Sequence, residues 1–150
     1  MKDAEKLKIL RECAEKIRAH AVEAYPNECC GALFGHDAAR EEGGEKPREV
    51  LQIHPLVNRR EDSPRNRFSV DPRDLIKAER TAETLGLSLI GWYHSHPDHP
   101  ARPSEFDRQN AWPWYSYIIV SVQDGAPGEM ASWRLREDRE RFVQEELHEE

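Results

Sequence analysis

Apolar residues recur every three or four positions in two long stretches of the chain, a spacing that places them on one face of an amphipathic helix. The first stretch covers residues 4–24 and ends before Pro26. The second covers residues 71–86, where Asp71 supplies a helix N-cap and Pro72 occupies the first helical position. The pattern therefore predicts two amphipathic helices in these stretches.

Shorter runs rich in aliphatic, aromatic and β-branched residues predict strands before, between and after these helices. A turn containing Gly125, Pro127 and Gly128 separates the last two runs, which predicts a hairpin. Ser104 is suited to cap a further short helix. Strands and helices without strict alternation predict an α/β domain in which helices pack on a mixed sheet. The expected strands are 27–35, 48–57, 68–70, 88–96, 115–122 and 130–136.

Length and charge set further limits. A chain of 150 residues has the usual size of one domain, so residues 1–150 are expected to form a single unit. The acidic tail 137–150 holds seven acids and two bases and so supplies −5 of the formal net charge of −7. Its conformation is ambiguous from the pattern alone. The remaining charge of −2 favours neither a nucleic-acid-binding surface nor a strongly acidic domain.

The first residues are too highly charged for a secretory signal, and no apolar run approaches the length of a membrane span. A cytoplasmic protein without a membrane partner is therefore expected. Two of the three cysteines, Cys29 and Cys30, are adjacent and would bridge only through a strained ring, so buried free thiols are expected. A role of Cys29 or Cys30 as metal ligand or nucleophile is the alternative.

One predicted strand ends in two histidines. Because side chains alternate on a strand, His94 and His96 project from the same face about 6.6 Å apart, while Ser95 faces away. Asp107 lies one turn after Ser104, so both share a face of the short helix. Two imidazoles and one carboxylate leave a fourth tetrahedral position for water, as in catalytic zinc sites. Iron or cobalt would tolerate the same ligands.

Hydrolysis at such a site also requires a base. A metal lowers the pKa of a bound water and polarises a substrate carbonyl, and a carboxylate that is not a ligand must accept the proton. Glu28 is the candidate, because it is an acid in an apolar, strand-like setting. A serine hydroxyl that faces the ligands would donate to the oxyanion, and Ser104 suits that role. A His-x-His pair alone, however, does not distinguish a metal site from two half-buried histidines.

The spacing of these residues resembles that of a known family. His94-x-His96-Pro97, followed by seven residues between His96 and Ser104 and then by Ser104-x-x-Asp107, resembles the JAMM motif of the MPN-plus metalloproteases. Residues 26–35, Pro-Asn-Glu-Cys-Cys-Gly-Ala-Leu-Phe-Gly, resemble the stretch that carries the catalytic glutamate of that family. The resemblance implies an MPN-like fold of the cytidine deaminase-like type, a curved mixed sheet flanked by helices.

The resemblance also implies roles for individual residues. The zinc ligands would be His94, His96 and Asp107, the general base and later acid would be Glu28, and Ser104 would help to stabilise the oxyanion. The implied function is that of a zinc-dependent isopeptidase or peptidase that cleaves after the C-terminal Gly-Gly of a ubiquitin-like or sulfur-carrier protein. The chain lacks the long insertions of large eukaryotic members. It is more similar to small prokaryotic members, one of which releases cysteine from the C-terminus of a carrier.

The sequence also bears on how a substrate would bind and on two alternative functions. A Gly-Gly tail is expected to add as a strand to an exposed sheet edge near the metal. A non-catalytic scaffold that binds a ubiquitin-like protein would not need the intact ligand set. A zinc nucleoside deaminase would need Pro-Cys-x-x-Cys, which is absent from the sequence. Asp98, His99 and Arg102 are expected to be solvated, and segment 58–67, with four arginines, is expected to be a solvated loop or a rim for an acidic partner.

Overall fold

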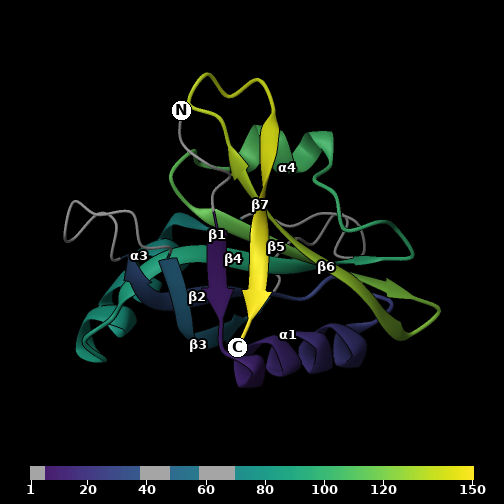
Figure 1. Ribbon diagram of the computed structural model, residues 1–150, viewed down its shortest axis with the longest axis horizontal. Helices are drawn as coiled ribbons and strands as arrows, with labels where there is room; N and C mark the ends of the chain where they lie inside the picture. The colour runs from purple at the N-terminus through teal and green to yellow at the C-terminus, as the bar shows by residue number, and fades with distance from the viewer. Residues whose placement is uncertain (1–5, 38–47, 58–69) are drawn as a thin grey trace.

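The computed structural model describes residues 6–37, 48–57 and 70–150 (Figure 1). No helix in these ranges is long and apolar enough to cross a bilayer. The elements are, in chain order, β1 (Lys6–Ile9), α1 (Arg11–Ala24), β2 (Cys30–Asp37), β3 (Arg48–Leu56), α3 (Pro72–Thr84), β4 (Ser88–Pro97), α4 (Glu105–Asn110), β5 (Ser116–Gln123), β6 (Ala126–Leu135) and β7 (Phe142–Glu149).

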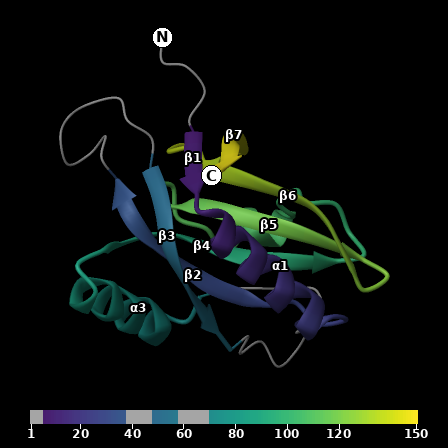
Figure 2. The same cartoon turned by 60° about the horizontal axis from the view of Figure 1, so that its bottom comes forward.

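The strands form a closed barrel in the order β1-β3-β2-β4-β5-β6-β7. Strand β1 runs parallel to both β3 and β7, and β4 runs parallel to β5, whereas the other neighbours are antiparallel. Helix α1 crosses one side of the barrel and contacts β3, β4, β5 and β6, and α3 contacts β2 and β4 on another side (Figure 2). The predicted mixed sheet is therefore confirmed, and it closes on itself.

Two apolar clusters cover opposite faces of the central strands. One cluster joins α1 to residues of five strands, with Leu7, Leu33 and Ile118 among its members. The other packs α3 against the opposite face of β2 and β4, where Trp92 is fully buried. Because side chains alternate along a strand, the face of β4 that carries Trp92 also carries the two histidines of that strand. The histidines thus lie on the face away from α1.

The helix expected over residues 4–24 is shorter than its apolar pattern predicts. Residues Lys6–Ile9 form β1, and α1 begins only at Arg11. Leu7 and Ile9 are fully buried whereas their lysine neighbours are not, which is the alternation of a strand. The spacing from Leu7 to Leu10 fits a helix equally well, so pairing of β1 with β3 and β7 decides the outcome.

The acidic segment 137–150 contains β7, which pairs with β6 on one side and with β1 on the other. Its buried residue Glu145 is only 2% exposed. The Glu145 carboxylate accepts hydrogen bonds from Ser132 Oγ at 2.8 Å and from Arg134 Nε at 2.9 Å. A paired acid therefore occupies a position where the buried face of a strand usually carries an apolar residue.

The hairpin predicted from residues 115–122 and 130–136 is confirmed as β5 and β6, but its turn is tighter than the glycines and proline indicate. Asp124 and Gly125 form the turn with φ angles of 50° and 82°. An Asp-Gly pair with positive φ at both positions is typical of two-residue hairpin loops. Pro127 and Gly128 consequently belong to β6.

Most of the other elements predicted from the sequence are present in the structure. The strand at 48–57 and the helix at 71–86 are confirmed as β3 and α3, and the strand expected at 27–35 begins later, at Cys30. The three cysteines are buried free thiols, as expected. Segment 58–67 and most of the strand expected at 68–70 lie outside the described residues.

Gly91 tests how tightly β4 packs against β5. A Cβ atom at Gly91 would lie 2.1 Å from the backbone oxygen of Ser116, which cannot move without shifting β5. We therefore expect Gly91→Ala to lower the free energy of unfolding by about 2 to 3 kcal/mol, measured by equilibrium urea denaturation. The control is Gly128→Ala, whose nearest contact would be an ordinary 3.4 Å. Equal effects of the two substitutions would contradict the prediction.

Candidate metal centre

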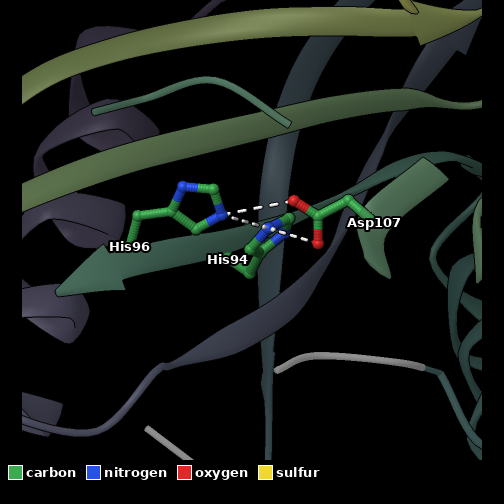
Figure 3. Close-up of side chains that lie close together, drawn as sticks. All are labelled: His94, His96 and Asp107. Carbon is green, nitrogen blue, oxygen red and sulfur yellow. Dashed lines mark hydrogen bonds and ion pairs between the residues drawn. The ribbon is translucent and has the colours of Figure 1, made fainter. Parts of the chain in front are cut away.

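Strand β4 and helix α4 bring three potential ligands together beside the sheet (Figure 3). The Nε2 atoms of His94 and His96 are 3.3 Å apart. The carboxylate of Asp107 reaches both rings, with Oδ1 lying 3.3 Å from His94 Nε2 and Oδ2 lying 3.2 Å from His96 Nε2. The three residues are 2%, 7% and 9% exposed, respectively. Their donor atoms thus converge on one point in a buried setting.

A backbone carbonyl orients the ring of His96. His96 Nδ1 lies 2.9 Å from the carbonyl oxygen of Pro100. Because a carbonyl oxygen only accepts hydrogen bonds, Nδ1 carries a proton, which leaves Nε2 as the ring atom that could coordinate a metal. Metal-binding histidines are commonly held by such an outer hydrogen bond. The proline-containing loop after β4 therefore prepares His96 as a ligand.

Helix α4 fixes the Asp107 carboxylate through its N-terminal cap. The Ser104 hydroxyl accepts a hydrogen bond from the backbone N–H of Asp107 at 3.0 Å, and Asp107 Oδ2 accepts one from the Ser104 N–H at 2.8 Å. This reciprocal pair is a capping box, so the predicted N-cap at Ser104 is confirmed. The cap uses a lone pair of the Ser104 oxygen, and the hydroxyl proton remains available as a donor.

Extending the register between β2 and β4 past Cys30 would place Glu28 on the face that carries the two histidines. Cys30 pairs with His94, and the pairing continues outward because Ser95 N–H donates to the Cys29 carbonyl at 3.2 Å. The Ser95 hydroxyl also accepts a hydrogen bond from Cys29 N–H at 2.8 Å. Continued by one more residue, this antiparallel register sets Glu28 opposite His96. Sequence reasoning gave Ser95 no role, since it faces away from the ligands.

Burial and charge act differently on the two carboxyl groups. Burial, together with the nearby charge of Asp107, raises the pKa of Glu28 to about 9. Burial alone would also raise the pKa of Asp107, but His94 and His96 together hold that pKa well below its usual range. Asp107 is therefore an anionic ligand candidate, whereas Glu28 holds a proton firmly. Two acids with such different proton affinities at one site are typical of a site that combines a ligand with an acid-base group.

Of the loop residues that the sequence predicts to be solvated, Asp98 has a structural role. Asp98 accepts hydrogen bonds from Tyr25 Oη at 2.7 Å and from Asp124 N–H at 2.8 Å, so this exposed residue joins three loops instead of being only solvated. The side chains of His99 and Arg102 are exposed, as expected.

Burial also decides the state of the two adjacent cysteines. The pKa of Cys29 is raised to about 11, mainly by burial, and the pKa of Cys30 is raised further. Both thiols therefore stay protonated, which argues against a role as nucleophile.

The residues present fit a metal ion. One donor atom from each of His94, His96 and Asp107 lies within 4.8 Å of the others. In the described part of the chain, these residues form the only group of three or more His, Cys, Asp or Glu side chains with that property. Two imidazole nitrogens and one carboxylate oxygen are a donor set that zinc accepts in catalytic sites. Neither Glu28 nor Cys30 belongs to the group, which agrees with a site of three protein ligands.

Comparison with known proteins assigns the chain to a family. Residues 10–136 match the family of prokaryotic homologues of the JAB domain, and the chain belongs to that family. It is also similar to a solved structure from Desulfitobacterium hafniense, with a TM-score of 0.80 and 33% identity over 96% of this chain and 92% of the other. The JAB/MPN fold implied by the JAMM-like spacing is therefore confirmed.

Curated relatives of the chain are named as peptide-cleaving enzymes. A desampylase from Haloferax volcanii is 33% identical over 77% of this chain and 81% of its own length. A probable TtuB-protein conjugate cleaving protease from Thermus thermophilus is 36% identical over 77% and 70%. A CysO-cysteine peptidase from Mycobacterium tuberculosis is 31% identical over 86% and 82%. The chain is thus a small prokaryotic hydrolase of the JAMM class, whose reaction is cleavage of a peptide or isopeptide bond.

Proposed function

We propose that the chain is a zinc-dependent peptidase or isopeptidase that cleaves after the C-terminal Gly-Gly of a ubiquitin-like or sulfur-carrier protein, with Glu28 as general base. The observation that supports this proposal is the β2–β4 register, which, if extended past Cys30, would set Glu28 opposite His96, together with the influence of the Asp107 charge on the Glu28 carboxyl. The names of the relatives support the substrate class, since they refer to TtuB conjugates and to CysO-cysteine. Three buried free thiols agree with action in the reducing cytoplasm.

Each polar group has a distinct part in the proposed reaction. A zinc ion held by His94, His96 and Asp107 would lower the pKa of a water molecule and polarise the scissile carbonyl. Glu28 accepts a proton from the attacking water and delivers it to the leaving amine. The Ser104 hydroxyl donates a hydrogen bond to the carbonyl oxygen as negative charge develops on it. Without a metal, burial and the charge of Asp107 keep Glu28 protonated. The positive charge of a zinc ion held nearby would lower the pKa of Glu28, so that it could accept the proton of the water and later return it.

The direct test is cleavage of a defined substrate. A ubiquitin-like carrier with a C-terminal Gly-Gly followed by a short peptide extension is incubated with the zinc-loaded protein, and the products are measured by intact mass spectrometry. Cleavage directly after the second glycine, lost on chelation and restored by zinc, is the expected result. Binding of the carrier without cleavage would instead support the scaffold function and overturn the proposal.

The burial of the ligands predicts a preference for glycine in the substrate. Because His94 and His96 are almost fully buried, a chain that reaches them must carry small side chains. Replacing the Gly-Gly of the carrier by Ala-Ala is therefore expected to lower kcat/KM by at least about tenfold. A matched carrier with two alanines placed before the glycines serves as the control. Equal cleavage of all three carriers would contradict the prediction.

Strand addition by the tail needs a free edge, and β4 does not offer one at its centre, where Gly91 to His94 have partners on both sides. Strand β4 pairs with β2 on one side and with β5 on the other. Among the described residues, the second half of β3 pairs only with β2, but β2 separates this edge from β4. The predicted addition of the tail to a sheet edge beside the metal ligands is thus not supported by β4 itself. The glycine preference rests on the burial of the ligands instead.

A further inference from the structure

Helix α4 carries a candidate metal ligand although it is short. It spans the six residues Glu105–Asn110, and helices of this length have little stability of their own. Its N-terminus is secured by the capping box of Ser104 and Asp107. A second attachment at the other end is therefore needed if Asp107 is to keep a fixed position.

The turn between β6 and β7 supplies that attachment. Arg139, in this turn, donates a hydrogen bond from Nη2 to the carbonyl oxygen of Ala111, the C-cap residue of α4, at 2.8 Å. In return, Arg108 of α4 donates from Nη1 to the backbone carbonyl oxygen of Arg139 at 2.7 Å. Arg139 is thus both donor and acceptor toward the same helix. A cation at a helix C-terminus also interacts favourably with the helix dipole.

The backbone at Arg139 is in an unusual conformation. Its φ angle is 62°, in the left-handed region that residues other than glycine, asparagine and aspartate seldom adopt. Such a conformation costs free energy and persists only where surrounding contacts hold it. The two hydrogen bonds to α4 are contacts of that kind, so the turn and the helix hold each other.

The rest of the segment between the ligands is held from the same side of the barrel. Ser121 Oγ of β5 donates to the His99 carbonyl at 2.6 Å, and Trp133 Nε1 of β6 donates to the Ala101 carbonyl at 3.0 Å. Side chains of β5, β6 and the β6–β7 turn therefore attach the segment at successive points. The contact made by Arg139 is the last of these and the nearest to Asp107 along the chain.

We infer that Arg139 is a positioning residue, which holds α4 so that the Asp107 carboxylate meets His94 and His96. This inference rests on the proposed function, because it assigns the Asp107 carboxylate to a zinc site. Arg139 does not touch that site itself. Its loss should loosen α4 and weaken zinc binding without removing a ligand.

The test compares Arg139→Ala with Arg141→Ala. Both substitutions remove one positive charge from the same turn. The side chain of Arg141 is exposed and interacts electrostatically with Asp138, and among the described residues it donates no hydrogen bond to α4. Removing a cation near a zinc site would by itself tighten zinc binding. If zinc binding is weaker in Arg139→Ala but not in Arg141→Ala, the loss of positive charge therefore cannot be the cause.

Two measurements are made on each protein. The first is amide hydrogen exchange of the Arg108 N–H, which donates to the Ser104 carbonyl in the first turn of α4, in the metal-free protein. Exchange at this amide is expected to become about fivefold faster in Arg139→Ala and to stay unchanged in Arg141→Ala. Zinc affinity, measured by competition with a chromophoric chelator, is expected to fall about fivefold in Arg139→Ala only. The visible spectrum of the cobalt-substituted protein should change in the same variant, and Arg139→Lys should recover part of each effect.

The outcomes separate the two ideas. Exchange and affinity that are the same in Arg139→Ala and Arg141→Ala would overturn the role of Arg139 while leaving the zinc site intact. If Arg139→Ala does not fold, Arg139→Lys, which keeps the charge but cannot reproduce the planar fork, must show the same effects in weaker form or the role is overturned. A wild-type protein that binds no zinc would overturn the proposed function, and with it the role of Arg139 toward a metal ligand.

Discussion

Replacing Glu28 by glutamine is expected to lower kcat/KM for the carrier substrate by about a thousandfold while one zinc ion per chain remains bound. Glutamine has nearly the same shape but cannot accept the proton of the attacking water. The measurement is cleavage of the Gly-Gly fusion together with metal content. Glu15→Gln, a substitution on the exposed face of α1, is the control and should leave both unchanged. Retained hydrolysis by Glu28→Gln would exclude Glu28 as the base.

The same substitution should alter how stability depends on pH in the metal-free protein. Burial raises the pKa of Glu28 from its ordinary value of 4.5 to about 9, so between these values the folded protein keeps a proton that the unfolded chain releases. The contribution of Glu28 to the free energy of unfolding must therefore fall as the pH rises. We expect wild type to lose about 2 to 4 kcal/mol more than Glu28→Gln between pH 5 and pH 8, measured by urea denaturation. If the free energy of unfolding changed with pH in the same way in the two proteins, the prediction would be contradicted.

Replacing Asp107 by asparagine is expected to weaken zinc binding by about 100-fold or more and to abolish hydrolysis at low zinc concentration. Asparagine keeps an oxygen that can accept the hydrogen bond from Ser104 N–H, so the helix cap is preserved. The negative charge beside His94 and His96 is lost, and the anionic candidate ligand becomes a neutral one. Zinc affinity by chelator competition, with circular dichroism to verify folding, is the measurement.

The matched control for this prediction is Glu105→Gln, in the same turn of α4. Glu105 is exposed and pairs with Arg108 on the surface, so its charge is equally close in sequence but is not directed at the histidines. Zinc affinity of Glu105→Gln should be close to that of wild type. If both variants bound zinc equally well, Asp107 would not be a ligand.

The parts of the site that depend on local structure were predictable from the sequence. His94 and His96 share a face because a strand alternates, and Ser104 and Asp107 meet because a capping box has fixed spacing. The position of Glu28, in contrast, does not depend on local structure. It depends on the register between β2 and β4, which joins segments more than sixty residues apart, for example at Cys30 and His94. Local pattern fixes no such register. The sequence indicated Glu28 only as an acid in an apolar, strand-like setting, and the resemblance to a family then indicated its place in the site.

The parts of the fold that were missed have physical reasons. At Leu7, the helical and the strand spacing both fit, and pairing with distant strands decides between them. In β7, the buried face carries Glu145, which is stabilised by Ser132 and Arg134. A sequence pattern that equates buried with apolar does not detect such a strand. The Arg139 contact to α4 was also invisible, because an arginine in a charged segment is usually solvated.

The pairing of β1 with β7 has a consequence for the order in which the protein assembles. Residues Lys6–Ile9 are synthesised before the other strands of the barrel, yet one of their two neighbouring strands, Phe142–Glu149, follows more than 130 residues later. Strand β4, by contrast, has its partners β2 and β5 within a much shorter span of synthesis. The sheet that bears the histidines can thus form on the emerging chain, while closure of the barrel must await its last strand. Until then, β1 presents an unpaired edge, and contacts between such distant segments form slowly.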